Sequence, residues 1–351
     1  MNRHVSRVAV GALLVLLALL PSLNVSLGPL LPGPVYTPGS LQLLAIIFVT
    51  IAVALTYDVL LGYTGLLSFG HALYFAVGCY CTVVLANDIG FAAGVAGALI
   101  ITALVAVVGN AVALRLTGIG YSMTTLALAQ LMYIGVQRGY LGTGGEFGVT
   151  FERDVLPSFF VGLESTKNLY WLALALVILT YAICWFMVRT QVGHVWQAVR
   201  ENPLRVTFLG YSVYMYRLGS ATFTSFLAGV AGVVYAIVLG GANPSVVGLA
   251  FSLSFVLMVV LGGRGLLWGA VLGGIVYSFA NLRLPLLSQS DQISGLSPWI
   301  SGPIAEPTFL LGILFVLVIL LLPGGLASFL TKRVRPVATD DSTSRSLDEA
   351  S

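Results

Sequence analysis

Long uncharged apolar runs, separated by short polar segments, dominate this sequence. The run at 41–61 is long enough to cross a membrane, because about 20 apolar residues in a helix span the hydrocarbon core. Only 8% of the 351 residues are charged and 58% are hydrophobic, with a mean hydropathy of +1.00, whereas a soluble domain has about 25% charged residues. We therefore expect an all-α integral membrane protein that crosses the cell membrane (inner or plasma) several times.

The apolar runs predict about ten transmembrane or re-entrant helices within one transmembrane domain at 1–330, followed by a polar, disordered tail at 331–351. The first run, at 8–20, has a basic start like a signal peptide, but no small-residue cleavage site follows it, so we expect a retained helix. The other helices are expected at 41–61, 62–86, 91–114, within 117–149, and at 169–188, 218–240, 246–262, 265–281 and 308–326.

The basic residues predict the orientation of these helices. With both termini in the cytoplasm, twelve of the sixteen basic residues fall on the cytoplasmic side, as expected from the positive-inside rule. The four left outside are Arg138, Arg153, Lys167 and Arg283. An error of one span would move the four arginines of 189–217 outside. The count therefore supports a cytoplasmic 189–217 segment and an external loop at 138–168.

The segment 189–217 is the longest polar interruption between apolar runs. Its apolar residues recur at helical spacing and predict an amphipathic helix against the membrane surface; they are Val195, Trp196, Val199, Leu204 and Phe208. Pro203 predicts a break, with a second short turn that ends at Gly210. Such a bent, exposed element suits docking to another protein. The alternative is an ordinary loop whose arginines only set the topology.

The beginning of the run at 62–86 is poorly suited to a lipid-facing helix, because glycines and polar residues interrupt it at Gly62, Thr64, Gly65, Ser68, Gly70 and His71. Broken backbone at membrane depth is tolerated where it is buried in protein or lines a cavity. We therefore expect this segment, which could be re-entrant, to contribute to a translocation path. A lone histidine is more often a satisfied hydrogen-bonding residue than a proton relay. Asp58, just before it, is either an ion site or, in our preferred interpretation, a locally paired residue at a helix end.

Polar side chains also occur along the run within 117–149. Ser122, Thr124, Thr125 and Gln130 lie in a membrane-length segment, where polar groups must find partners inside the bundle or face water or a solute. Hydrogen bonds between helices are the simpler explanation for any one of them. The glycine-rich turn at 143–148 could adopt positive φ angles and expose amide groups to an anion such as a carboxylate.

A set of short motifs follows in order along 50–330. They are Gly62, Tyr63, Gly65, Ser68, Gly70, His71 and Ala72; the run 125–130; the turn 143–148; Ala198, Arg200, Glu201, Asn202, Gly210 and Arg217; the run 261–274; and LLPGGL near the end of the last span. This set resembles permease subunits of the branched-chain amino acid family of ABC importers. Arg264 departs from the small or aliphatic residue expected within 261–274.

The resemblance implies a permease that pairs with a second, similar permease subunit, two ABC ATPase subunits and an extracytoplasmic solute-binding protein. The solute would be a branched-chain or other amino acid. Contacts with the ATPases would come from the coupling loop at 189–217, through Arg200, Glu201, Asn202, Arg205 and Gly210. The substrate path would include Tyr63, Ser68, His71, Thr124, Thr125, Gln130, Thr143, Gly144 and Gly145.

The chain has no phosphate-binding loop of its own, since Lys167 and Lys332 are its only lysines and neither lies in such a motif. The apolar runs also lack a histidine, cysteine or carboxylate cluster. We therefore expect no enzyme, catalytic residue, cofactor or metal. The alternatives are a urea or short-amide ABC permease, an ion-coupled secondary transporter that uses Asp58 and His71, and a structural membrane subunit. The residues do not distinguish an amino acid from a small amide as the solute.

Overall fold

The computed structural model describes residues 17–22, 34 and 36–288, except 153, 163 and 164, together with 309, 312, 313, 315, 316, 320 and 324–327. Most of the spans expected at 8–20 and 308–326, and all of the tail at 331–351, lie outside the described residues. The cytoplasmic location of both termini therefore stays a prediction.

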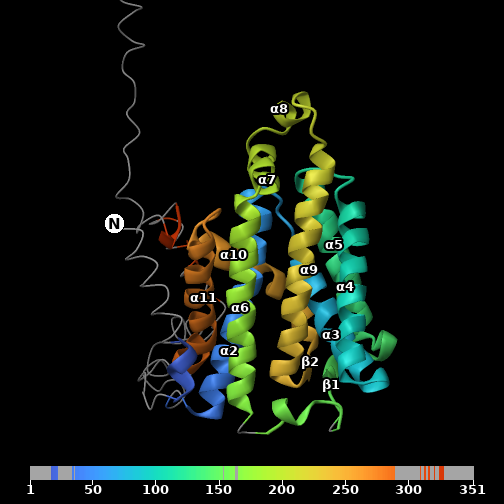
Figure 1. The fold of residues 1–351 in the computed structure, drawn as a ribbon, viewed down its shortest axis with the longest axis vertical. Helices are drawn as coiled ribbons and strands as arrows, with labels where there is room; N and C mark the ends of the chain where they lie inside the picture. Colours follow the sequence, from blue (N-terminus) through green and yellow to red (C-terminus); the bar gives the residue numbers. More distant parts are fainter. Residues whose placement is uncertain are drawn as a thin grey trace, which may run out of the picture.

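The described chain is a helical bundle (Figure 1). Its long helices are α2 (Pro38–Asp58), α3 (His71–Ile89), α4 (Phe91–Ala113), α5 (Ile119–Gln137), α6 (Thr166–Arg189), α9 (Val213–Leu239) and α11 (Leu267–Ser288). Shorter helices are α7 (Gln191–Glu201), α8 (Pro203–Phe208) and α10 (Leu249–Gly262), and a π turn, η3, covers Val59–Tyr63. Single 3-10 turns are η1 (Leu20–Ser22), η4 (Tyr140–Gly142), η5 (Gly145–Phe147), η6 (Ser158–Phe160) and η7 (Pro244–Val247).

Six helices in the described part of the chain are long and apolar enough to cross a membrane: α2 with its π turn, α3, α4, α5, α6 and α9. They lie where the apolar runs predicted spans. The break predicted between 62 and 70 is also present, because regular helix stops at Tyr63 and resumes at His71.

The two spans expected at 246–262 and 265–281 instead form a sharply bent pair. The axes of α10 and α11 differ by 119°, and the turn between them has positive φ angles at Gly263 (109°) and Gly265 (79°). With 14 residues, α10 is shorter than the hydrocarbon core, because a helix rises about 1.5 Å per residue and the core is about 30 Å thick. The pair therefore counts as at most one broken span, or as a re-entrant loop.

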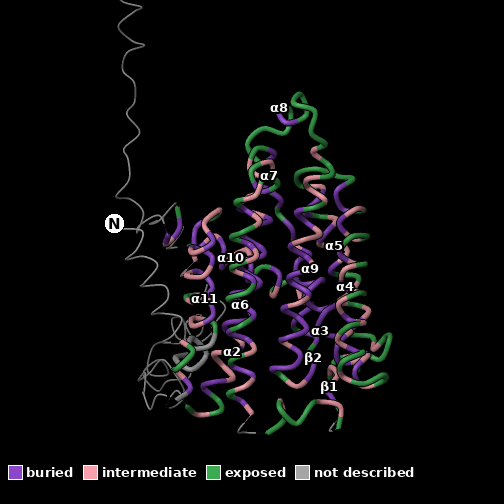
Figure 2. Tube along the Cα trace, in the orientation of Figure 1, coloured by how far each residue is buried: buried purple, intermediate pink, exposed green. Residues whose placement is uncertain are grey.

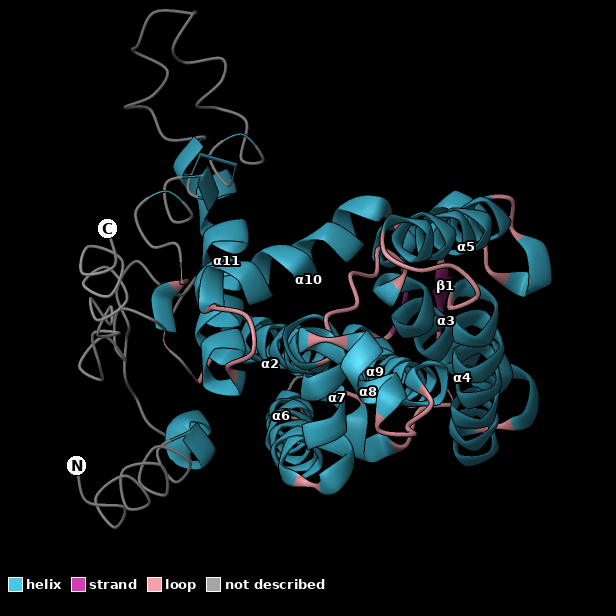
Figure 3. Ribbon diagram, turned by 90° about the horizontal axis from the view of Figure 1, so that it is seen from above, coloured by secondary structure: helices cyan, strands magenta, loops and turns pink. Residues whose placement is uncertain are grey.

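The central helix of the bundle is α2. It packs against α6, α9, α10 and α11, and it lies among these helices when the bundle is seen from above (Figure 3). Its residues from Ala45 onward are almost all buried. In contrast, α4 and α5 have many exposed residues (Figure 2). The protein core therefore surrounds α2, α3 and α9.

Glycines allow α3 and α9 to approach each other closely. A Cβ atom added at Gly78 would overlap the carbonyl group of Gly229, and one added at Gly232 would overlap the carbonyl oxygen of Phe75. Small residues at such positions let helix backbones pack closely in a membrane, where dispersion contacts replace the hydrophobic driving force.

The two ends of the bundle have different structures. At one end, α7 and α8 extend beyond the spans (Figure 1). At the other end, a two-residue strand, β1 (Val149–Thr150), pairs antiparallel with β2 (Gly241–Ala242). This pair fastens the 138–165 loop to the end of α9. The loop and the 189–217 segment thus lie at opposite ends, as predicted, whereas the strand pair was not predicted.

Candidate coupling site and translocation path

The 191–201 part of the coupling loop is an amphipathic helix, as predicted. The hydroxyl of Thr190 accepts a hydrogen bond of 3.3 Å from the amide of Gly193 and caps the N-terminus of α7. Trp196 and Val199 are buried, and the Trp196 ring lies 6.1 Å from the Phe223 ring of α9. The apolar side of α7 therefore holds it firmly against the bundle.

The break predicted at Pro203 comes directly after the end of α7. The side chain of Asn202 accepts a 3.0 Å hydrogen bond from the amide of Arg205 and caps α8, with Pro203 as the first helical residue. Gly210 ends the turn with a φ of 86°. Because of this break, Leu204 and Phe208 do not continue the buried stripe of α7. They are 71% and 89% exposed, and Val206 is the buried residue of α8.

Arg200 connects α7 to the broken end of α2. Its guanidinium group donates a hydrogen bond to the carbonyl oxygen of Gly62, and its aliphatic stem passes beside Gly65. Gly65 has a φ of 75° and no side chain, which leaves room for that stem. Both Arg200 and Glu201 are largely exposed. Of the residues nominated for ATPase contact, Arg200 is thus the one that reaches back into the bundle.

Asp58 pairs locally at the end of α2. Its Oδ1 atom accepts a 2.7 Å hydrogen bond from the amide of Gly265, in the turn between α10 and α11. The side chain is buried, and its Oδ2 atom has no hydrogen-bond partner among the described residues. Gly62 packs against both groups, since an added Cβ would overlap the carboxylate and the Gly265 amide. This geometry supports the helix-end interpretation of Asp58.

Four of the sequence motifs therefore converge at one place. Gly62 belongs to the first, Arg200 to the coupling loop and Gly265 to the run 261–274. Near the chain terminus, Gly325 of LLPGGL lies against Gly263. Sequence reasoning missed this convergence, because no periodicity or spacing relates segments so far apart. Arg264 is exposed beside it, and nothing in the structure explains why an arginine occurs there.

Three of the predicted path residues are part of the interior. The Nε2 atom of His71 lies 2.9 Å from the hydroxyl of Thr56, and His71 is fully buried beside Tyr57. The hydroxyl of Thr125 accepts a 3.1 Å hydrogen bond from the amide of Phe69. The carbonyl of Ser68, also buried, accepts one of 2.8 Å from Tyr57. The bonds to Ser68 and Phe69 hold the non-helical segment at 64–70 in place against α2 and α5.

The remaining predicted path residues lie elsewhere. Tyr63 is half-buried in the π turn, near Arg200. On α5, Thr124 donates a 2.9 Å hydrogen bond to the carbonyl of Gly120 in its own helix, whereas Gln130 is exposed. The turn at the far end has the predicted positive φ angles at Gly144 (69°) and Gly145 (61°), and the Thr143 hydroxyl donates to the carbonyls of Val136 and Tyr140. The predicted residues are thus distributed over the height of the bundle.

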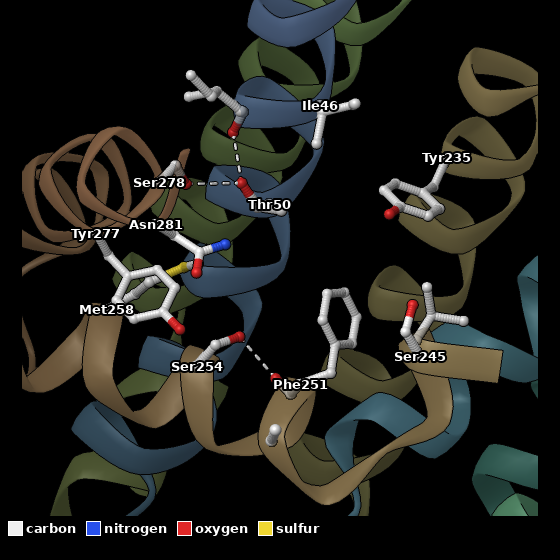
Figure 4. Close-up of a pocket in the computed structure, with 13 residues that line it drawn as sticks. Ile46, Thr50, Tyr235, Ser245, Phe251, Ser254, Met258, Tyr277, Ser278 and Asn281 are labelled. Carbon is white, nitrogen blue, oxygen red and sulfur yellow. Dashed lines mark hydrogen bonds between the residues drawn. The ribbon is translucent and has the colours of Figure 1, made fainter. Parts of the chain in front are cut away.

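A cavity that the sequence did not indicate lies between α2, α9, α10 and α11 (Figure 4). It has a volume of about 340 Å³, and none of the predicted path residues lines it. Its polar lining consists of Thr50, Tyr235, Ser245, Ser254, Tyr277, Ser278 and Asn281, and its apolar lining of Ile46, Ile47, Val246, Ala250, Phe251 and Met258. The residues come from four stretches of the chain, at 46–50, 235, 245–258 and 277–281, so only the folded bundle brings them together.

The sequence of the chain matches known proteins over much of its length. Residues 39–322 match the sequence model described as branched-chain amino acid transport system / permease component. The chain is similar to the high-affinity branched-chain amino acid transport system permease protein LivM of Escherichia coli K12, with 28% identity over 265 residues, which cover 68% of this chain and 62% of that protein. It is 26% identical over 208 residues to a probable branched-chain amino acid transport permease protein LivM of Methanocaldococcus jannaschii, over 58% of each chain.

A shorter similarity, 32% identity over 160 residues, relates it to the autoinducer 2 import system permease protein LsrC of Klebsiella pneumoniae, over 43% of this chain and 44% of that protein. The chain therefore spans less than two thirds of the length of these relatives. No solved structure matches it.

Proposed function

This chain belongs to the family of branched-chain amino acid transport permease components, and on that premise we propose that it is the permease subunit of an ATP-driven ABC importer. Family membership makes it a multi-pass inner-membrane transport subunit rather than an enzyme. In our proposal it forms half of the translocation path for branched-chain or other amino acids. The observation that carries the proposal is the link from an exposed, bent helix pair, α7 and α8, to the broken helices inside the bundle.

The coupling step follows from that link. Cytoplasmic ATPase subunits would bind the exposed α8 tip and the Glu201 end of α7. Because Trp196 anchors α7 to the bundle, a push on the tip would move α7 against the spans. Arg200 would pass this displacement to Gly62 at the end of α2, and the Asp58–Gly265 hydrogen bond would pass it to the bent pair α10–α11.

The second permease subunit would cover the exposed side of α5. Gln130 lies near the middle of this helix on its exposed side, and a polar side chain in contact with lipid at that depth is unfavourable. Ala127, one turn earlier, is also exposed and small enough to permit close helix packing. A partner helix on this side would shield Gln130 and place it beside the solute path between the two subunits.

At the opposite end, the solute-binding protein would dock on the 138–165 loop. The antiparallel pair of β1 and β2 fixes part of that loop to the end of α9, which gives the docking surface a defined position. Several of its large apolar side chains are exposed, Leu141, Phe147 and Phe159 among them.

The test is reconstitution of the complex as it is purified from its native membrane. We expect mass spectrometry to find a second permease and ABC ATPases with this chain, and we expect proteoliposomes to take up leucine only with ATP and the binding protein. Glu201→Lys should reduce the leucine taken up per ATP hydrolysed. Uptake of urea but not leucine would favour the short-amide alternative. Uptake driven by an ion gradient through this chain alone would overturn the proposal in favour of the secondary transporter.

A further inference from the structure

The cavity between α2, α9, α10 and α11 has the chemistry of a solute site. We propose that it binds the transported solute inside this single subunit, and that the solute is small, has no net charge and carries both an aliphatic part and hydrogen-bonding groups. That the bound solute is the transported one rests on the proposed import function. Binding of a solute in the cavity does not depend on that function. The cavity would be a solute site within one subunit, in addition to the proposed solute path between the two permease subunits.

The lining determines the ligand class. None of the described residues that line the cavity is charged, and an ion with net charge is strongly disfavoured in such surroundings unless it is paired. A zwitterion has no net charge, and hydroxyl and amide groups can hydrogen-bond both of its ends. The volume, about 340 Å³, falls at the lower end of the range for small-molecule sites, about 300–1,000 Å³. A small solute is therefore favoured over a peptide or a sugar chain.

Polar and apolar residues alternate around the cavity, with Met258 beside Tyr277 and Phe251 between Ser254 and Ser245 (Figure 4). Thr50 on α2, Ser278 on α11 and Ser254 on α10 contribute hydroxyl groups, while Phe251 and Met258 contribute apolar surface. An aliphatic side chain would pack on the apolar surface. The polar groups of the same molecule would then face the hydroxyls.

Hydrogen-bonding capacity remains for a ligand. The Thr50 hydroxyl donates to the carbonyl of Ile47 at 2.9 Å, and the Ser254 hydroxyl donates to that of Phe251 at 2.7 Å. The Thr50 oxygen also lies 3.1 Å from the Ser278 hydroxyl, which can donate to it. One lone pair then remains on Thr50 and two on Ser254 to accept from an ammonium group. The side chains of Tyr235 and Asn281 also line the cavity and can donate to a carboxylate (Figure 4).

The position of the cavity agrees with a site that is filled from the side opposite to α8. Tyr235 lies close to the end of α9 at Leu239, and α8 precedes the beginning of that helix. Two of the four walls, α10 and α11, are the bent pair whose turn Asp58 holds through Gly265. A displacement that starts at α7 therefore reaches the walls of the cavity.

The first measurement is thiol protection in the purified complete complex. We would introduce Ala250→Cys, because Ala250 is exposed and lines the cavity, and label it with a small, water-soluble methanethiosulfonate. The wild-type chain gives the background labelling, to which the half-buried Cys81 can contribute, whereas Cys79 and Cys184 are buried. We expect leucine to slow labelling and glutamate, which has a net charge, to have no effect. Equal protection by both, or none by leucine, would overturn the inference.

The second measurement fills the cavity. Ala250→Phe should weaken leucine binding by about tenfold or more, and should raise the KM for uptake accordingly. Leu253→Phe is the matched control, because Leu253 is exposed on the same helix and does not line the cavity. If the Ala250→Phe complex imports leucine with an unchanged KM, the cavity is not the solute site. The proposed import function would still stand.

Failure of the wild-type complex to import leucine, together with leucine protection of the Ala250→Cys thiol, would count against leucine as the transported solute but support binding in the cavity. Labelling by a lipid-soluble maleimide but not by the water-soluble reagent would show a lipid-filled groove instead and would overturn the inference.

Discussion

The amide of Gly265 donates a 2.7 Å hydrogen bond to the Oδ1 atom of Asp58, and the two residues are 207 positions apart in the chain. Asp58 ends the central helix α2, and Gly265 lies in the turn between α10 and α11. The bond therefore fixes the central helix to the bent pair. Gly62 packs against both groups, and its carbonyl oxygen accepts the hydrogen bond from Arg200 of α7. A short series of contacts thus runs from the coupling loop to the inner helices.

We predict that Asp58→Asn has a mild effect and Asp58→Leu a large one. Asparagine keeps an oxygen that can accept from the Gly265 amide. Leucine leaves that buried donor without a partner, at a cost of about 1–3 kcal/mol. Thermal unfolding of the purified complex and ATP-driven uptake in proteoliposomes measure both variants. If folded Asp58→Asn lost uptake altogether, the ionisable carboxylate itself would be required, as an ion-coupled transporter would need.

Arg200→Met should lower uptake more strongly than it lowers stability. Methionine keeps much of the apolar stem beside Gly65 but cannot donate to the Gly62 carbonyl. ATPase subunits should still bind, because the α8 tip is unchanged, so ATP hydrolysis should continue with several-fold less leucine imported per ATP. The control is Arg115→Met, which removes an exposed arginine beyond the end of α4. The same import-to-hydrolysis ratio in both variants would contradict the role of Arg200.

The helices themselves could be predicted from the sequence. In the membrane core, backbone polar groups have no water to bond, so an uncharged run of membrane length forms a helix that satisfies its own backbone hydrogen bonds. The amphipathic α7 and the break at Pro203 could also be predicted, since both depend on local spacing and on the geometry of proline. The bent pair could not. The runs at 246–262 and 265–281 have the composition of two spans, and only packing against α2 and the turn at 263–265 reveals the bend.

The candidate site could be predicted only in part. The polar and glycine-rich residues of 62–72 were correctly expected to interrupt a helix, but His71 and Thr125 proved to be bonded to nearby interior groups rather than gathered in a cavity. The lining of the observed cavity comes from Thr50, Tyr235, Ser254 and other serines and aromatic residues that look ordinary in sequence. Their proximity depends on the tertiary fold, which residue spacing does not encode.

Gly232→Ala should destabilise the bundle, although alanine is the better helix former. Its Cβ atom would overlap the carbonyl oxygen of Phe75, so α3 and α9 would have to move apart, at a cost of about 1–3 kcal/mol. Gly219→Ala is the matched control on the same helix, because nothing lies within 4 Å of its added Cβ. There the higher helix propensity of alanine should stabilise by up to about 1 kcal/mol. Thermal unfolding in detergent distinguishes the two, and equal midpoints would contradict the close packing.

Phe208→Ser should release the ATPase subunits and leave the permease folded. Phe208 is 89% exposed at the tip of α8, so its replacement removes no contact from the bundle. A large exposed aromatic at the centre of a docking surface is a typical hot spot, and its truncation should weaken ATPase binding by about tenfold or more. Phe147→Ser is the control, because Phe147 is 98% exposed at the opposite end and should not affect ATPase binding. Both are measured as ATPase retained on the affinity-purified permease over a salt series. Equal retention by the two variants would show that α8 is not the docking surface, and Glu201 and the rest of α7 would then have to provide it.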